Sequence, residues 1–170
     1  MTIIDIMEFA SPIGQLTVAA HDGRVCALSF TDRWPQRRVH LEKRYRQVTL
    51  RPVSDSAVLS RLRDYFAGDL RALTGINLDP GGTAFQQRVW RELQNIPPAQ
   101  TISYGELARR IGSPAACRAV GAANGANPVA IAIPCHRVIS TKGELTGYGG
   151  GIARKRWLLE HERGAVSMTF

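Results

Sequence analysis

The stretch SYGELARRIGSPAACRAVGAAN, residues 103–124, predicts two short helices joined by a tight turn. Ser103, followed three residues later by Glu106, fits the capping-box pattern that opens a helix. We expect this first helix to end near Arg110. A second short helix is expected to follow it after a turn.

The second helix is expected to cover residues 115–124. Ser113 and Pro114 precede it, and serine caps helix N-termini while proline is tolerated in the first turn. Gly112 then lies in the turn between the two helices. The stretch has the outline of a helix-turn-helix, which also occurs in helical proteins that never touch DNA.

The surface of the second helix is unusually smooth, because alanine and glycine dominate it and Arg118 is its one long cationic side chain. A slim helix can approach the minor groove of DNA, which is only about 6 Å wide. Close packing between helices would also explain the alanines, but it leaves Arg118 without a purpose. The candidate DNA contacts on this helix are Arg118, Ala119, Ala123 and Asn124.

The charge of the chain favours a polyanionic partner such as nucleic acid. Its 170 residues include 22 Lys and Arg against 14 Asp and Glu, which gives a net charge of +8. Seven of these basic residues lie between positions 33 and 51. Charge runs are usually solvated surface, so this segment is read as an exposed loop with no assigned role.

Composition predicts a globular protein of the cytoplasm. Hydrophobic residues make up 44% of the chain, yet no apolar stretch approaches the roughly 20 residues of a membrane helix. Asp5 and Glu8 stand where a secretory signal would carry basic residues. The three cysteines, at positions 26, 117 and 135, form no C-x-x-C pair, so neither a zinc knuckle nor a disulfide framework is indicated. We expect no metal and no cofactor.

Two halves are predicted, an N-terminal domain over residues 1–80 and a C-terminal domain over residues 81–170, in an α+β fold. Apolar runs separated by turn residues indicate an antiparallel sheet in the first half. A helix over residues 56–67 follows, and nothing in this half looks catalytic. The expected strands cover residues 3–9, 16–20, 25–30 and 47–53.

The second half is expected to be helical. Thr83 can cap a helix whose apolar stripe ends at Ile96, before two prolines. Another helix, over residues 153–163, carries Glu162 one turn after two leucines. This carboxylate is therefore expected to face the core, where it needs a partner.

The sequence IPCHRV, residues 133–138, places Cys135 beside His136 in an apolar run. Free cysteines are often simply buried hydrophobes. A neighbouring imidazole, however, is the usual means of making a cysteine thiolate near neutral pH. Adjacent side chains tend to point apart, so we expect the proton path to run through water. Glu162 is the candidate third group that orients the imidazole.

Several motifs together resemble the O6-alkylguanine-DNA alkyltransferases of the bacterial Ogt type, which repair DNA by direct reversal. From Phe85 to Glu162 the similarity is nearly continuous, whereas the N-terminal half is similar mainly in organisation. The motifs, in the order and spacing of that family, are Arg118-Ala119-Val120-Gly121, Asn127-Pro128, Pro134-Cys135-His136-Arg137-Val138, Tyr148-Gly149-Gly150-Gly151 and Lys155-Arg156-Trp157-Leu158-Leu159-Glu160-His161-Glu162.

The resemblance implies an irreversible, stoichiometric transfer of the alkyl group from O6-alkylguanine in DNA to Cys135. It implies an RNase H-like N-terminal domain and a winged-helix-like C-terminal domain. His136 and Glu162 would keep the thiol deprotonated, and Asn127 would hold the turn that carries the cysteine. Tyr104 would press on the target phosphate and help to protonate the departing guanine.

The resemblance also implies that a nucleotide is flipped out of duplex DNA from the minor groove, with Arg118 filling the hole. The pocket would be lined by Tyr148, the carbonyls of Cys135 and Val138, and the backbone around Gly149, where many relatives have serine. We expect a monomer. The alkyl size that the pocket admits, repair of O4-alkylthymine and cooperative binding along DNA stay open.

Two other classes of protein are compatible with parts of the sequence. A cysteine hydrolase using Cys135, His136 and Glu162 would turn over, but nothing in the sequence marks an oxyanion hole. A helix-turn-helix transcription factor would leave these three residues unexplained. A helix of alanines also offers few side chains with which to read bases in the major groove.

Overall fold

The computed structural model describes residues 1–167, and their side chains as far as residue 164. The chain forms two compact units, Met1–Pro80 and Gly81–Phe170, and each is described by itself. Within residues 1–167, no helix is both long and apolar enough to cross a membrane.

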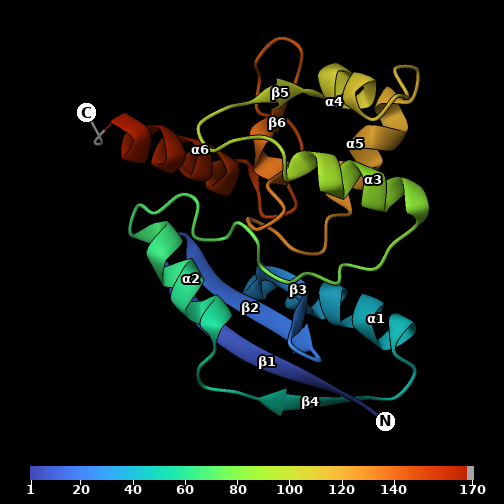
Figure 1. Ribbon diagram of the computed structural model, residues 1–170, viewed down its shortest axis with the longest axis vertical. Coiled ribbons are helices and arrows are strands. Elements are labelled where there is room, and N and C mark those ends of the chain that lie inside the picture. Colours follow the sequence, from blue (N-terminus) through green and yellow to red (C-terminus); the bar gives the residue numbers. More distant parts are fainter. Residues whose placement is uncertain (168–170) are drawn as a thin grey trace. The chain divides into compact units, whose positions relative to one another are not determined.

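The first unit is a four-stranded sheet with two α-helices (Figure 1). Its elements are β1 (Thr2–Ser11), β2 (Gly14–His21), β3 (Arg24–Phe30), a 3-10 turn (Thr31–Arg33), α1 (Trp34–Arg44), β4 (Val48–Pro52) and α2 (Ala57–Phe66). The strands lie in the order β3-β2-β1-β4. All four strands and α2 were predicted, with ends that differ by a few residues.

The prediction of a wholly antiparallel sheet is wrong at β4. The first three strands pair antiparallel, but β4 runs parallel to β1. The expected loop over the basic segment is wrong too, because this segment forms helix α1. A parallel pairing needs a crossover connection, and α1 supplies part of it between β3 and β4.

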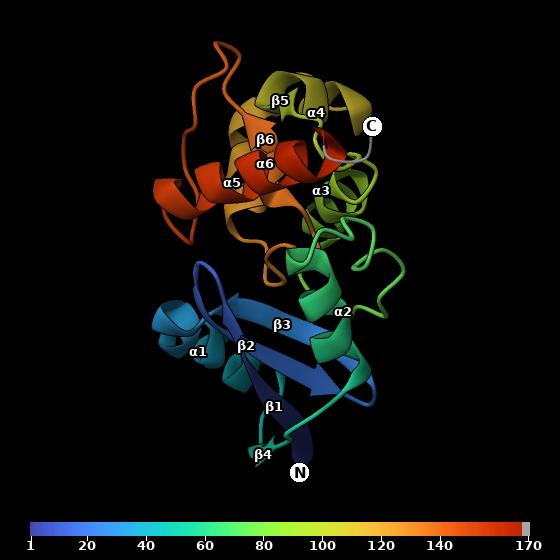
Figure 2. The same cartoon turned by 90° about the vertical axis from the view of Figure 1, so that its left-hand side faces the viewer.

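The two helices cover opposite faces of this sheet (Figure 2). Leu41 of α1 packs with Ile4 of β1 in a buried apolar cluster. Phe66 of α2 stacks on Phe9, with ring centroids 5.9 Å apart. Ile4 and Phe9 are five residues apart in one strand, so their side chains point to opposite faces.

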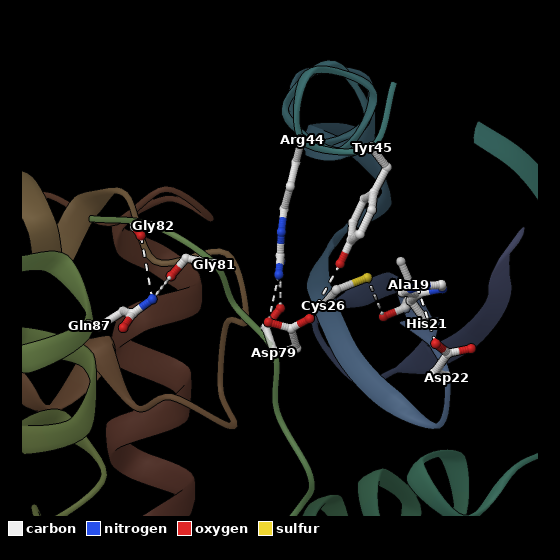
Figure 3. A network of polar contacts seen from close by, with 10 residues as sticks. All are labelled: Ala19, His21, Asp22, Cys26, Arg44, Tyr45, Asp79, Gly81, Gly82 and Gln87. Atoms are coloured by element: carbon white, nitrogen blue, oxygen red, sulfur yellow. Dashed lines mark hydrogen bonds and ion pairs between the residues drawn. The ribbon is translucent and has the colours of Figure 1, made fainter. Parts of the chain in front are cut away.

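The end of the first unit is tied down beside β3. Leu78 forms a parallel bridge with Val25. Arg44, at the end of α1, donates to a carboxylate oxygen of Asp79 at 2.6 Å, and Tyr45 donates to the other at 3.4 Å (Figure 3). These contacts fix the chain just before it enters the second unit.

The second unit is mainly helical. Its elements are α3 (Ala84–Leu93), β5 (Ile102–Ser103), α4 (Tyr104–Arg110), α5 (Cys117–Gly125), a 3-10 turn (Cys135–Arg137), β6 (Val138–Ile139) and α6 (Ile152–Ser167). Strands β5 and β6 pair in parallel. Thr83 caps α3, as predicted, and does so with a reciprocal capping box. Ser103, where the capping box was predicted, caps α4 by accepting from the Glu106 amide.

The start of α5 differs from the prediction. The helix begins at Cys117, and no side chain caps it. Residues 113–116 instead form a turn, in which the Ala116 amide donates to the Ser113 carbonyl at 2.9 Å. Proline at the second position of such a turn is favourable, because its fixed φ suits that position. Gly112, with φ of +75°, provides the break after α4.

Candidate active site

Cys135 lies at the start of a 3-10 turn that follows a strained loop, and it is 6% exposed. Ile131 in this loop has φ of +69°, a conformation that β-branched residues rarely adopt. Asn127 holds the loop from inside. Its amide nitrogen donates to the Ile133 carbonyl at 2.7 Å, and its oxygen accepts from the Val129 amide at 3.0 Å.

His136 is completely buried, and its Nε2 lies 2.8 Å from Oε1 of Glu162. A carboxylate only accepts, so Nε2 carries the hydrogen and Nδ1 is the basic nitrogen of the neutral ring. Nδ1 has no hydrogen-bond partner within the described part of the chain. Burial lowers the pKa of His136, which favours the neutral ring and leaves Nδ1 able to accept a proton.

Glu162 is completely buried and ties several segments together. It accepts from His136, from Nε and Nη2 of Arg137 at 3.0 and 2.8 Å, and from the Ala99 amide at 3.4 Å. Burial opposes ionisation of this carboxyl, but His136 and Arg137 together hold its pKa well below the ordinary value. Glu162 is therefore ionised and fixes the orientation of the imidazole.

Two buried cations of this site received no role from the sequence. Arg137 is 7% exposed and also donates to the Ile96 carbonyl at 2.7 Å. Lys155 is 0% exposed, and its ammonium donates to the Val138 carbonyl at 2.7 Å and the Thr146 carbonyl at 2.9 Å. Helical spacing could have found Lys155, because it shares a face of α6 with Leu158 and Glu162.

Tyr104 and Tyr148 both interact electrostatically with Cys135. The Tyr104 hydroxyl donates to the Thr146 carbonyl at 3.3 Å. The Tyr148 hydroxyl is buried and has no hydrogen-bond partner among residues 1–167. Burial raises the pKa of both phenols, and the nearby Cys135 adds to this shift, so both hydroxyls carry a hydrogen that they can donate.

Helix α5 divides into an exposed face and a buried face. Arg118 and Ala119 are exposed, whereas Ala123 and Asn124 are 3% and 4% exposed. The Ala123 carbonyl accepts from the indole of Trp90 at 2.8 Å, since this face of α5 packs against α3. Ala123 and Asn124, which were expected to contact DNA, both lie on this covered face of the helix.

Asn124 instead faces the nucleophile segment. Its amide nitrogen lies 3.4 Å from the Cys135 carbonyl. A Cβ placed at Gly149, which was expected to line the substrate pocket, would meet no atom within 4 Å. Among the described residues, no group of three or more His, Cys, Asp or Glu side chains could hold a metal ion.

The arrangement suits nucleophilic chemistry at sulfur. His136, next to Cys135 in the 3-10 turn, meets Glu162 of α6. The roles of the three residues as thiol, base and orienting carboxylate stay predictions. Two cations also belong to this site. Arg137 forms an ion pair with Glu162, and the charge of Lys155 interacts with Cys135. Burial keeps bulk water away from this group of charges.

Comparison with known proteins finds one family over almost the whole chain. The family model described as 6-O-methylguanine DNA methyltransferase, DNA binding domain, matches residues 84–164, and the ribonuclease-like domain of the same enzyme matches residues 8–80. A relative from Mycobacterium tuberculosis called methylated-DNA–protein-cysteine methyltransferase is 49% identical, and the match covers 90% of this chain and 88% of the relative. A relative of the same name from Salmonella typhimurium is 45% identical over 91% and 93% of the two chains.

Solved structures agree with these matches. The crystal structure of Mycobacterium tuberculosis O6-methylguanine methyltransferase is similar with a TM-score of 0.81 and 46% identity, covering 95% of this chain and 94% of that one. The structure of the mycobacterial protein in complex with DNA gives a TM-score of 0.80 over the same shares at 46% identity. The O6-methylguanine-DNA methyltransferase of Pyrococcus kodakaraensis gives 0.74 at 28% identity, covering 94% and 98% of the two chains.

Proposed function

Since the chain belongs to the 6-O-methylguanine DNA methyltransferase family, we propose that it repairs alkylated DNA by direct reversal, with Cys135 as acceptor. The alkyl group passes from O6 of guanine to the sulfur. The observation that carries this proposal is the buried chain of contacts behind Cys135, in which Arg137 holds Glu162 and Glu162 holds His136.

The proton of the Cys135 thiol moves to Nδ1 of His136 through one water molecule. The thiolate then attacks the alkyl carbon, so that an S–C bond forms while the C–O6 bond breaks and its electron pair stays on the guanine. The departing guanine takes up one proton, which the hydroxyl of Tyr104 donates. Glu162 stabilises the imidazolium during the transfer.

The product at Cys135 is a thioether, which water does not readily cleave. Each molecule therefore acts once. A thioester of a cysteine hydrolase would be hydrolysed and the enzyme would turn over, so stoichiometry separates the two chemistries.

Cys135 cannot reach an alkylated base that is stacked inside a duplex. The nucleotide therefore flips out of the base stack, and this unstacking costs roughly a few kcal/mol of free energy. Helices α4 and α5 form a helix-turn-helix that docks in the minor groove, where the small exposed residue Ala119 permits close approach. Arg118 fills the space of the flipped nucleotide. The excess of basic residues in the chain contributes phosphate contacts.

The protein acts as a monomer on double-stranded DNA, since Cys135, His136 and Glu162 all come from one chain. No disulfide joins any of its three cysteines, at positions 26, 117 and 135, within the described residues, which suits a reducing compartment such as the cytoplasm. An oxidised Cys135 could not act as a nucleophile.

Excess O6-methylguanine duplex tests the proposal through stoichiometry. We expect transfer to stop after one methyl group per protein molecule, with unmodified guanine left in the DNA strand. Continued turnover, or release of methanol into the solution, would overturn alkyl transfer to the protein and favour a hydrolase.

A further inference from the structure

Asn124 is a buried polar residue of α5 that the proposed steps leave without a role. Its side chain belongs to a residue that is 4% exposed, although the sequence suggested a contact with DNA. The side-chain oxygen is buried and has no hydrogen-bond partner within residues 1–167. Burying an amide without all of its hydrogen bonds costs free energy, and leucine would fill a similar volume without that cost. The contacts of the side-chain nitrogen therefore call for an explanation.

The side-chain nitrogen of Asn124 contacts both the segment of the nucleophile and Tyr104. It donates to the Cys135 carbonyl at 3.4 Å. Burial raises the pKa of the Tyr104 phenol, and a hydrogen bond from Asn124 acts against that rise. A bond that favours the phenolate is one that the amide donates to the phenol oxygen. The amide nitrogen carries two hydrogens, which is enough for both contacts.

The ring of Tyr104 packs against the same face of α5. Gly121 lies one turn before Asn124, and a Cβ placed at Gly121 would lie 3.9 Å from Cδ1 of Tyr104. The tyrosine hydroxyl donates to the Thr146 carbonyl at 3.3 Å. The phenol oxygen therefore contacts one acceptor, the carbonyl, and one donor, the amide.

Proton donation by Tyr104 changes what its oxygen needs. In the proposed transfer the O–H bond breaks, the hydrogen passes to the departing guanine, and the electron pair stays on the oxygen, which later regains a proton from water. A phenolate only accepts hydrogen bonds, so the Thr146 carbonyl cannot stabilise it. The Asn124 amide is a donor that is in place beforehand, and hydrogen bonds to charged groups are roughly twice as strong as neutral ones. Contacts that strengthen in the transition state accelerate a reaction.

Resting on the proposed function, we propose that Asn124 is a positioning residue for proton donation by Tyr104. Its amide holds the phenol oxygen in place and stabilises the phenolate that forms as the guanine leaves. Through the Cys135 carbonyl, the same amide links this proton donor to the segment of the nucleophile. Asn124 touches neither the sulfur nor the base in this account.

A double-mutant cycle tests whether Asn124 acts through the Tyr104 hydroxyl. Single-turnover rates of methyl transfer at saturating O6-methylguanine duplex are measured for the wild type, Asn124→Leu, Tyr104→Phe and the double variant. We expect Asn124→Leu to slow transfer about tenfold while the hydroxyl is present, because a hydrogen bond to a charged oxygen is lost. In the Tyr104→Phe background the same change should slow transfer by at most about threefold. Asn124→Ser, which is too short to reach the phenol, repeats the cycle with a side chain that needs less space.

Trp90→Phe is the matched control. It deletes another buried hydrogen bond to α5, the one from the Trp90 indole to the Ala123 carbonyl. General loosening of α5 should slow transfer by the same factor with and without the Tyr104 hydroxyl. Trp90→Phe should therefore show no coupling to Tyr104→Phe.

Three results would overturn the proposal. Slowing by the same factor in both backgrounds would make Asn124 merely structural, and a wild-type rate in both Asn124 variants would remove it from the reaction. Coupling of equal size for Trp90→Phe would assign the effect to the packing of α5. Methyl transfer to Cys135 in these cases would leave the proposed repair function intact, whereas a wild type whose Cys135 stays unmodified would overturn both.

Discussion

Nε2 of His136 donates to Oε1 of Glu162 at 2.8 Å, between two side chains that are both completely buried. The contact leaves Nδ1 as the basic nitrogen of the neutral ring. It also makes the imidazole dependent on a carboxylate that Arg137 keeps ionised. We therefore expect the reactivity of Cys135 to depend on Glu162, a carboxylate that lies in α6 far along the sequence.

Glu162→Gln should slow methyl transfer by at least about tenfold, because a neutral amide stabilises the imidazolium poorly. The number of methyl groups accepted should stay at one per molecule, since the carboxylate does not touch the substrate. Rapid-quench kinetics with a duplex substrate measures both quantities. Glu160→Gln, a change at an exposed position of the same helix, is the control. A wild-type rate for Glu162→Gln would remove the carboxylate from the relay.

Arg137→Met should destabilise the protein by about 3–5 kcal/mol in the free energy of unfolding, since it leaves Glu162 buried with a weaker partner. Urea unfolding of the variant and the wild type measures the difference. The double variant Arg137→Met with Glu162→Gln should recover part of the loss, because the unpaired charge is then gone. A single variant as stable as the wild type would show that Arg137 contributes little to this site.

Stability should fall as the pH drops through about 6.5, the ordinary pKa of histidine, because burial lowers the pKa of His136. Below that pH the unfolded chain binds a proton that the folded chain does not, so acid favours unfolding. The slope approaches about 1.4 kcal/mol per pH unit for one proton. Urea unfolding between pH 5 and 8 checks this, and His136→Gln should flatten the curve. An unchanged curve in His136→Gln would assign the dependence to other groups.

Arg118→Ala should slow repair of duplex DNA strongly while hardly slowing reaction with the free base O6-benzylguanine, which needs no flipping. Rates with both substrates at saturating concentration test this, provided that the pocket accepts the benzyl group. Arg91→Ala on α3 removes another exposed arginine of the same unit as a control.

Measurements at two salt concentrations distinguish nucleotide replacement by Arg118 from phosphate binding by the same side chain. A purely phosphate-binding Arg118 would weaken binding to all DNA and reduce the salt slope by about one unit, with little effect on the chemical step. Equal slowing on duplex and free base would contradict both roles. It would indicate that α5 only supports the pocket.

Local patterns predicted most of the fold. Alternating apolar residues gave the strands of the first unit, and the side-chain caps Thr83 and Ser103 marked the starts of α3 and α4. Helix α1 was missed because its charges hide a narrow apolar face with Leu41 as its one buried residue. The parallel direction of β4 depends on how that helix crosses the sheet, which local sequence does not specify.

The inward position of Glu162 and its contact with His136 were predicted, because Glu162 shares a helical face with leucines and a buried carboxylate needs a partner. The rest depends on distant partners. Arg137 and Lys155 look like ordinary surface cations until the fold places Glu162 and the Val138 carbonyl beside them. Asn124 was assigned to DNA because the sequence does not show which face of α5 is covered. The packing of α5 against α3 decides this.

The central claim is that Cys135 itself receives the alkyl group, and the site of modification tests it most directly. The protein is incubated with O6-methylguanine duplex, digested, and analysed by tandem mass spectrometry. The account predicts a gain of about 14 Da, one methylene in place of a hydrogen, on Cys135 alone, and none in Cys135→Ser, which should still bind the duplex. Methylation of Cys26 or Cys117 with Cys135 unmodified, or transfer by Cys135→Ser at the wild-type rate, would contradict it.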